Sequence, residues 1–334
     1  MVAKKVFITG SDGFIGSHLL ERLVCDGHSV RAVCHYNSFG GKGWLDSIDE
    51  KVLSSVDVQL GDIRDGDHIK RLMKGSDTVI HLAALIAIPF SYHSPRSYID
   101  TNVTGTLNVL QAALDVGVDR LLHTSTSEVY GTAQFVPITE EHPVVGQSPY
   151  AASKIAADQL AHSFYNSFEL PVTTIRPFNT YGPRQSTRAI IPTVITQLAR
   201  GHKSIKLGAT TPTRDFSYID DTVSGFCAAM DAKSIEGLTL NLGSGFEISI
   251  QKTVEIIAMH FNTEIKICTE KERMRPEKSE VNRLLSCNSR AMDLLNWMPK
   301  YTGLDGFKKG IKKTADWFSL TENMAKYPDS GYVI

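Results

Sequence analysis

The sequence has little of what marks secreted, membrane or nucleic-acid-binding proteins. Its five cysteines, at positions 25, 34, 227, 268 and 287, show no CxxC or metal-ligand spacing, so we expect reduced thiols and no metal site. The 35 basic and 36 acidic residues leave a formal charge of −1, too small for a general attraction to nucleic acid. No apolar run approaches about eighteen residues and no leader-like pattern opens the chain, which indicates a soluble cytoplasmic protein.

A glycine-rich turn near the N-terminus indicates a dinucleotide site. The short β-rich run 5–9 leads into Gly10, Gly13 and Gly16, and an amphipathic pattern follows from Ser17. Strand, glycine turn and helix start therefore occur in the order of a dinucleotide-binding fold. The glycines let backbone N–H groups approach a pyrophosphate at the N-terminus of a helix, where the partial positive charge favours an anion.

The remaining cofactor contacts are expected where later strands end. The second strand, 29–34, ends at His35 without the acidic residue that commonly holds the ribose 2′-hydroxyl of NAD. Because loss of that carboxylate removes repulsion against a 2′-phosphate, we expect NADP, with NAD as the alternative. The expected cofactor contacts are Gly10, Gly13, Phe14, Ile15, Gly16, His35, Asp62, Ile63, Ala83, Ala84, Tyr150, Lys154 and Pro177.

Two residues four positions apart, Tyr150 and Lys154, project from one face of a predicted helix. An ammonium beside a phenol favours the phenolate, so we expect Lys154 to lower the pKa of Tyr150 towards the range of a general base. Thr126, at the end of the preceding strand, is placed to hydrogen-bond the same substrate hydroxyl. Ser127 and Glu128 follow it, and Glu128 offers a second acid/base group that plain alcohol oxidation does not need.

The alternation of strands and helices predicts an α/β fold with a Rossmann-like, doubly wound parallel sheet. After Pro177 short elements replace this alternation. We therefore expect a dinucleotide-binding domain over 1–177 and a smaller mixed α/β substrate lobe over 178–334, with the chain crossing back. Within the first domain, 85–95 is predicted as a loop over the nicotinamide and sugar, and 102–116 as a helix.

Taken together, these motifs resemble the extended short-chain dehydrogenase/reductases that modify nucleotide sugars. The motifs, in that family's order, are GxxGxxG, Asp62-Ile63, His81-Leu-Ala-Ala84, Tyr150-xxx-Lys154, Arg176-Pro-Phe-Asn179 with Gly-Pro-Arg184, and Arg214-Asp-Phe. The resemblance covers nearly the whole chain, up to Trp317, and leaves 322–334 outside it.

The pattern Thr-x-Glu-x-Tyr-Gly, which includes Thr126 and Glu128, resembles the 4,6-dehydratases of that family. Epimerases commonly carry a small residue where Glu128 stands. At Ser127 many dTDP-glucose dehydratases have Asp, whereas GDP-mannose 4,6-dehydratases have Ser. The run 123–142, with 191–193, most resembles the LegB dehydratases of legionaminic-acid synthesis, whose members act on a nucleotide-linked N-acetylglucosamine, GDP-linked in some bacteria.

The resemblance implies a mechanism. Tyr150 accepts the proton of the sugar 4-hydroxyl while C4 gives its hydride to the nicotinamide. Glu128 then removes the C5 proton, water leaves from C6, and the hydride returns to C6, giving a 4-keto-6-deoxy sugar. Either Glu128 or a water held by Ser127 protonates the departing hydroxyl.

Substrate contacts are expected from arginines, whose guanidinium fork fits diphosphate oxygens, and from a few neighbouring side chains. The expected set is Ile86, Asn179, Arg184, Arg188, Arg214 and Arg275. The family commonly forms a dimer through the helix that holds Tyr150 and the helix near 103–114, so the resemblance implies a homodimer or larger homo-oligomer.

Three other functions remain open. A UDP-glucuronate decarboxylase also shows Thr-Ser-Glu in this position, but it usually needs a cation in the loop after the fourth strand, where none precedes Arg96. A 4-epimerase would return the hydride to C4, which leaves Glu128 without a task. A non-catalytic redox-sensing binder would not need Tyr150 and Lys154.

Overall fold

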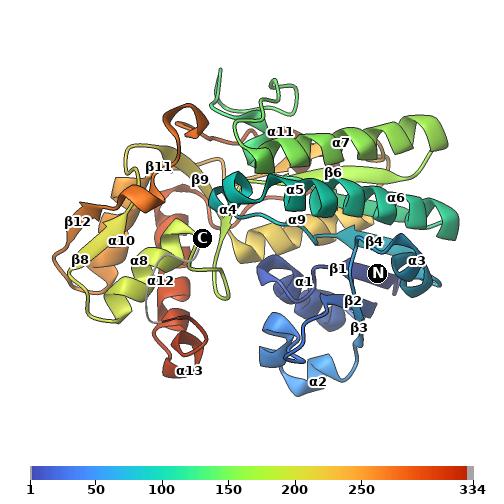
Figure 1. Cartoon of the computed structure of the whole chain (residues 1–334), viewed down its shortest axis with the longest axis horizontal. Helices are drawn as coiled ribbons and strands as arrows, with labels where there is room; N and C mark the ends of the chain where they lie inside the picture. The colour runs from blue at the N-terminus through green and yellow to red at the C-terminus, as the bar shows by residue number, and fades with distance from the viewer. Residues whose placement is uncertain (1, 329–334) are drawn as a thin grey trace.

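The computed structural model describes residues 2–328 (Figure 1). Of the segment 322–334, positions 329–334 lie outside the described residues. The strands are β1 (Lys5–Thr9), β2 (Ser29–His35), β3 (Asp57–Gly61), β4 (Thr78–His81), β5 (Arg120–Thr124), β6 (Val172–Pro177), β7 (Asn179–Tyr181), β8 (Ser204–Leu207), β9 (Thr213–Tyr218), β10 (Thr239–Leu242), β11 (Glu247–Ser249) and β12 (Lys266–Thr269). The α-helices are α1 (Phe14–Cys25), α2 (Glu50–Leu53), α3 (Gly66–Met73), α4 (Ile88–His93), α5 (Pro95–Tyr98), α6 (Gly105–Val116), α7 (Pro149–Phe168), α8 (Ile190–Ala199), α9 (Ile219–Asp231), α10 (Ile250–His260), α11 (Ser289–Leu295), α12 (Gly303–Phe318) and α13 (Thr321–Met324).

Seven strands form one sheet in the order β10-β6-β5-β4-β1-β2-β3, and every neighbouring pair is parallel. The predicted doubly wound parallel sheet is therefore confirmed. The strand order reverses beside β1 and β4, which is where open α/β sheets bind ligands at their carboxyl ends. The last strand to join, β10, comes from residues after position 177, so the chain does return to this sheet.

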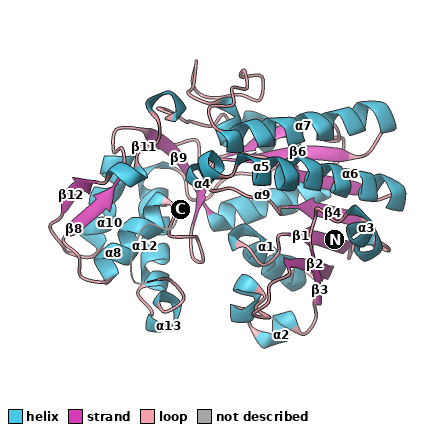
Figure 2. Cartoon of the chain, in the orientation of Figure 1, coloured by secondary structure: helices cyan, strands magenta, loops and turns pink. Residues whose placement is uncertain are grey.

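Helices cover both faces of the sheet (Figure 2). On one face α3, α6 and α7 pack over Phe7, Val79 and Leu121 of the strands. On the other face α1 and α9 pack against one another and against the strand residues that point to that face, such as Ile8 and Leu122. Burial on both faces explains why these strands are apolar throughout rather than alternating.

The second lobe, of short strands and longer helices, lies beside the carboxyl edge of the large sheet (Figure 1). A three-stranded sheet has the order β11-β9-β7, and β8 pairs in parallel with β12. The helices α8, α10 and α12 pack on one another there. The division of the chain at position 177 into two domains stays a prediction.

Several local predictions differ from the structure. The stretch 85–95, predicted as a loop, contains α4, which Pro89 begins well because proline suits the first turn of a helix. The helix predicted over 102–116 starts as a π-helix over Ile99–Thr104 and becomes α6 at Gly105. Directly after Pro177 a short strand, β7, forms because β9 supplies a pairing partner far along the chain.

Candidate active site

A cavity of about 1500 Å³ runs from the carboxyl ends of the central strands into the second lobe. It exceeds the roughly 300–1,000 Å³ of a usual small-molecule site, which leaves room for two ligands. The cavity wall includes each residue that the sequence predicted for catalysis, cofactor or substrate. These residues are Gly10, Gly13, Phe14, Ile15, Gly16, His35, Asp62, Ile63, Ala83, Ala84, Ile86, Thr126, Ser127, Glu128, Tyr150, Lys154, Pro177, Asn179, Arg184, Arg188, Arg214 and Arg275. Their individual roles stay predictions.

The glycine turn brings backbone against backbone at the start of α1. Gly10 has φ +70°, a conformation that favours glycine, and a Cβ there would lie 2.7 Å from the backbone nitrogen of Ala83. A Cβ at Gly16 would collide with the carbonyl oxygen of Gly10. No side chain caps the first turn of α1, whose N-cap is Gly13. This turn therefore fits the pyrophosphate of a dinucleotide, which would accept from the first N–H groups of the helix.

The end of the cavity beside β2 and β3 has more carboxylates than the sequence indicated. The backbone N–H of His35 donates to Oδ2 of Asp12, 3.2 Å away, so a carboxylate from the glycine turn stands at the end of β2. Asp46 lines the cavity nearby. Asp62 accepts from Arg64 at 2.5 Å, and this bond holds the pKa of Asp62 below its usual range. β2 itself ends without an acidic residue, but Asp12 reaches its end from the loop after β1.

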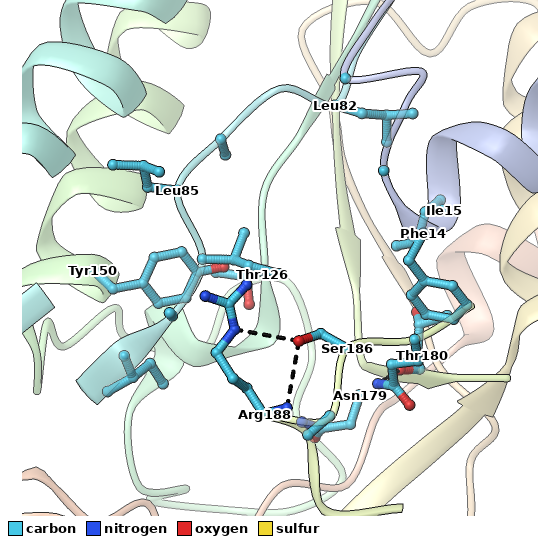
Figure 3. A pocket seen from close by; sticks show the side chains of 18 of the residues that line it. Phe14, Ile15, Leu82, Leu85, Thr126, Tyr150, Asn179, Thr180, Ser186 and Arg188 are labelled. Carbon is cyan, nitrogen blue, oxygen red and sulfur yellow. Dashed lines mark hydrogen bonds between the residues drawn. The ribbon is translucent and has the colours of Figure 1, made fainter. Parts of the chain in front are cut away.

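The first two turns of α7 hold Tyr150 and Lys154, which are 6% and 3% exposed. Ser148 caps this helix by accepting from the N–H of Ala151, and a proline follows it. The Nζ atom of Lys154 donates to the carbonyl oxygen of Thr124, 2.6 Å away at the end of β5. This bond holds the helix against the strand end from which Thr126 enters the cavity, beside Tyr150 (Figure 3).

Burial, not the lysine, dominates the ionisation of Tyr150. Burial raises the pKa of Tyr150 well above its usual value, a hydrogen bond to Thr126 works to lower it, and the charge of Glu128 raises it further. Burial also lowers the pKa of Lys154 to about 8. The prediction that Lys154 lowers the pKa of Tyr150 is therefore wrong for the chain by itself, since the ammonium is directed at a carbonyl oxygen.

Glu128 lies in a short turn directly after Thr126 and is 8% exposed. Arg275 donates to Oε2 of Glu128 at 3.4 Å and lies 3.9 Å from Glu280. Arg214, buried in β9, donates to Oε1 of Glu280 at 3.2 Å. We call these four residues, Glu128, Arg275, Glu280 and Arg214, the carboxylate–guanidinium cluster. It brings a candidate base and two candidate diphosphate ligands to one wall of the cavity.

The other two predicted arginines have different surroundings. Arg184 donates to both carboxylate oxygens of Glu21 on α1, at 2.6 and 3.2 Å, so its guanidinium fork is engaged by the protein. Its predicted role as a substrate clamp therefore has the weaker geometric basis. Arg188 extends into the cavity across from Tyr150, with its Nε and backbone N–H directed at Ser186 (Figure 3).

Three buried polar atoms of residues in the wall of the cavity have no hydrogen-bond partner within residues 2–328. They are Oγ1 of Thr124, Oδ1 of Asn179 and Oε1 of Gln185. Buried polar atoms are almost always paired, so all three fit contacts to a bound ligand. Together with the glycine turn, they make the residues present suitable for a nicotinamide dinucleotide and a second polar ligand.

Sequence reasoning missed Asp12 and Glu280. Asp12 lies within the glycine turn, where its position beside His35 follows from the pairing of β1 with β2. Glu280 lies five residues after Arg275 in a segment without regular periodicity, and no spacing signal in the sequence ties it to Glu128.

Comparison with known proteins identifies the family. A profile described as GDP-mannose 4,6 dehydratase matches residues 7–314. The chain belongs to the GDP-mannose 4,6 dehydratase family.

Members and relatives of this family perform more than one reaction. A UDP-glucose 4-epimerase from Mycolicibacterium smegmatis is 32% identical over 319 residues, covering 94% of this chain and 98% of the relative. A UDP-N-acetyl-alpha-D-glucosaminuronate decarboxylase from Bacillus cytotoxicus is 32% identical over 330 residues, covering 96% and 99%. The crystal structure of DesIV, a dTDP-glucose 4,6-dehydratase from Streptomyces venezuelae solved with NAD bound, superimposes with a TM-score of 0.82 at 27% identity, covering 97% and 98%.

These relatives show that the chain is a nucleotide-sugar-modifying enzyme of the extended short-chain dehydrogenase/reductase group. Within residues 2–328, no helix is long and apolar enough to cross a membrane. The same residues contain no group of His, Cys, Asp and Glu side chains suited to a metal ion.

Proposed function

We propose that the protein is a nucleotide-sugar 4,6-dehydratase. The observation that carries this proposal is the place of Glu128, a nearly buried carboxylate in the same cavity wall as Tyr150 and close enough for its charge to act on the phenol. A 4-epimerase has no step for such a carboxylate, whereas elimination of water needs a base at C5.

The chain's own residues divide the proton transfers. Oη of Tyr150 takes the proton from the sugar 4-hydroxyl, and Thr126 holds that hydroxyl by a hydrogen bond. When bound, an oxidised nicotinamide cofactor supplies a hydride acceptor and a positive charge near this phenol, which offsets the effect of burial on its pKa. Oε of Glu128 removes the C5 proton, which the 4-ketone has acidified. Glu128, or a water held by Ser127, returns a proton to the hydroxyl that leaves C6 as water.

We propose a nucleotide-linked N-acetylglucosamine, with GDP or UDP as the nucleotide, as the substrate. The resemblance of 123–142 to the LegB dehydratases of legionaminic-acid synthesis supports this sugar. Arg214 and Arg275 support a diphosphate, because two guanidinium groups in one wall match its oxygens. Their present partners, Glu128 and Glu280, would share them with the diphosphate on binding.

For the cofactor we propose NAD rather than the NADP expected from the sequence. A 2′-phosphate at the end of β2 would lie near the carboxylates of Asp12 and Asp46. The ribose 2′-hydroxyl of NAD would instead donate to Asp12, as it does to an acidic residue in this fold. The measurement is the affinity of the protein for each cofactor at equal ionic strength.

A second candidate is decarboxylation of a uronate, and Arg188 favours it. The loop after β4 lacks a cation before Arg96, but Arg188 reaches the cavity from the loop before α8 (Figure 3). A guanidinium there could hold the carboxylate of a uronic acid.

One experiment separates these functions. The protein is incubated with GDP- and UDP-linked N-acetylhexosamines and with UDP-linked uronates, and the products are read by mass spectrometry. Loss of one water from an N-acetylhexosamine supports the dehydratase. Loss of carbon dioxide from a uronate supports the second candidate, and an unchanged mass with a new stereoisomer supports an epimerase.

We also propose that α6 and α7 form a homodimer contact. Leu107 on α6 and Ile99 before it are 38% and 47% exposed, which is consistent with a covered surface in the assembly. Light scattering of the purified protein tests this, and a monomer at micromolar concentration contradicts it.

A further inference from the structure

A buried ion cluster lies between α7 and the strands β5 and β6. Asp158, 5% exposed, stands one helical turn after Lys154 on α7. Its Oδ2 accepts from Oγ of Ser125 at 2.8 Å and from Nη2 of Arg176 at 2.9 Å, and its Oδ1 lies 3.1 Å from Nε2 of His123. No step of the proposed reaction uses this carboxylate.

We propose that Asp158 is a positioning residue that serves as the buried counter-charge of Lys154 and fixes the end of β5 against α7. Residues four apart on a helix are neighbours on one face, so the carboxylate acts on the ammonium from the next turn. The effect of Asp158 and Lys154 on catalysis rests on the proposed function. The pairing of their two charges is independent of that function.

The contacts of the pair form a clamp on three consecutive residues. Lys154 donates to the carbonyl oxygen of Thr124, while Asp158 engages His123 on one side of it and Ser125 on the other. Thr126, Ser127 and Glu128 follow immediately. Two residues of one helix therefore set the position of the strand end that delivers the other predicted catalytic groups.

The need for a counter-charge follows from burial. Burial lowers the pKa of Lys154 to about 8, and Asp158 acts in the opposite direction. Burial works to raise the pKa of Asp158, but its bond with His123 and the charge of Arg176 on β6 hold that pKa below the ordinary value. Asp158 therefore remains ionised at neutral pH and opposes the loss of the proton from Lys154.

The other titratable groups near the lysine are neutral at neutral pH or are paired with another residue. His81 on β4 and His123 on β5 have pKa values lowered mainly by burial, so both rings are neutral there. Tyr150, on the same helix, has its pKa raised by burial and is also neutral. Glu128, which lines the same cavity, is paired with Arg275. Asp158 is thus the carboxylate placed to balance the ammonium.

A second cavity, of about 200 Å³, supports this role. Its wall includes Asp158, His162, Thr174 and Arg176. It has room for water, which would hydrate the carboxylate. Hydration and the Arg176 ion pair both favour the charged form of Asp158.

The first test measures stability and needs no substrate. Asp158→Asn leaves the Lys154 ammonium buried without its counter-charge, so we expect a clear drop in melting temperature. Adding Lys154→Met should recover part of that drop. The fold-increase in the unfolding constant of the double variant should be at least about tenfold smaller than the product of the fold-increases of the two single variants. If Asp158→Asn does not fold, the double variant should still fold.

The matched control is Asp221→Asn, alone and with Lys154→Met. Asp221 is an equally buried carboxylate on α9 that accepts from the backbone N–H groups of Lys300 and Tyr301. Its effect should add to that of Lys154→Met without recovery. Additive effects for Asp158 as well, or a double variant that fails to fold, would overturn the pairing.

The second test measures pH dependence in the intact enzyme. The ammonium form of Lys154 is lost above about pH 8. Because its bond to Thr124 holds the strand end that delivers Thr126 and Glu128, kcat should fall on that side. In Asp158→Asn the fall should begin about one pH unit lower or more, because an opposite charge has been removed, and in Asp221→Asn it should not move. The pH dependence of NAD affinity, followed by protein fluorescence, should shift in the same direction. Unshifted pH profiles overturn the positioning role. A protein without turnover on any nucleotide sugar disproves the proposed function, and the stability measurements then still test the pairing of Asp158 with Lys154.

Discussion

The half of the cavity proposed for the cofactor and the half proposed for the substrate differ in what lines them. In the first, which we call the cofactor half, backbone atoms and small residues such as Gly10, Gly16 and Ala83 meet at van der Waals limits. In the substrate half, the carboxylate–guanidinium cluster brings four charged side chains together from three distant segments. The shape of the cofactor half depends on the absence of side chains at the glycines. The shape of the substrate half depends on ion pairs, for which a bound ligand would compete. Substitutions should therefore act through sterics in one half and through electrostatics in the other.

The largest expected effect is in the substrate half, at Glu128. Glu128→Gln keeps the shape of the side chain but removes the base at C5, so we expect water loss to fall by about a thousandfold or more, within the usual range for general-base removal. Cofactor content should be unchanged, because Glu128 lies outside the glycine turn. The measurement is the rate of the 4-keto-6-deoxy product by mass spectrometry.

Glu280→Gln is the matched control for Glu128→Gln. It removes the other carboxylate of the same cluster, which contacts both arginines. We expect a change in KM with the elimination step retained. Equal losses of kcat in both variants would mean that the cluster acts as a whole and that Glu128 has no special role.

The cofactor half should fail by sterics at Gly16. In Gly16→Ala the new Cβ collides with the carbonyl oxygen of Gly10, so the turn must open and lose its fit to a pyrophosphate. We expect NAD affinity to fall by about a hundredfold, in keeping with the loss of two or more hydrogen bonds to a charged group. The measurement is NAD retained after gel filtration.

Gly41→Ala provides the control for the Gly16 variant. Its Cβ would meet Asp46 at 3.5 Å, an ordinary contact, and should leave NAD binding intact. A Gly16→Ala protein that retains NAD normally would show that the close approach of backbone segments is not what shapes this half.

The same contrast explains what could be predicted from the sequence. The cofactor half is encoded by spacing: the glycines, Tyr150 and Lys154 lie at fixed offsets on a strand, a turn and a helix, and the sheet was predicted with them. The substrate half depends on which distant segments meet. Glu280 reaches Arg214 across 66 positions, and β7 forms because β9 lies beside it. No local sequence pattern predicts such a contact between distant segments.

The pKa of Tyr150 shows a different limit. Helical spacing correctly placed Lys154 and Tyr150 on one helix, one turn apart, but the ammonium donates to the carbonyl oxygen of Thr124. Which acceptor a lysine chooses depends on the carbonyl groups around its tip, and burial of the phenol depends on the packing of α4 and α5. Both are properties of the tertiary structure.

A smaller effect is expected at Arg275. Arg275→Lys keeps the charge but loses the guanidinium fork, so we expect KM for the nucleotide sugar to rise by about 10–100-fold with kcat less affected. Arg283→Lys is the control, since Arg283 is half-exposed and paired with Glu247 outside the cavity. A KM that stays the same in Arg275→Lys would remove this arginine from diphosphate binding.

The smallest expected effect concerns electrostatics in the cofactor half, and it tests whether that half depends on shape alone. Asp12 is the carboxylate at the end of β2, and Asp12→Asn keeps an acceptor for the N–H of His35 while removing the negative charge. For a partly exposed charge the effect is on the order of 1 kcal/mol, so affinity for NADP should rise several-fold relative to NAD. Asp26→Asn, at the far end of α1 and paired with Arg22, should leave the ratio unchanged. If Asp12→Asn weakens both cofactors equally, then Asp12 supports the turn rather than reading the ribose, and the cofactor half owes its selectivity to sterics.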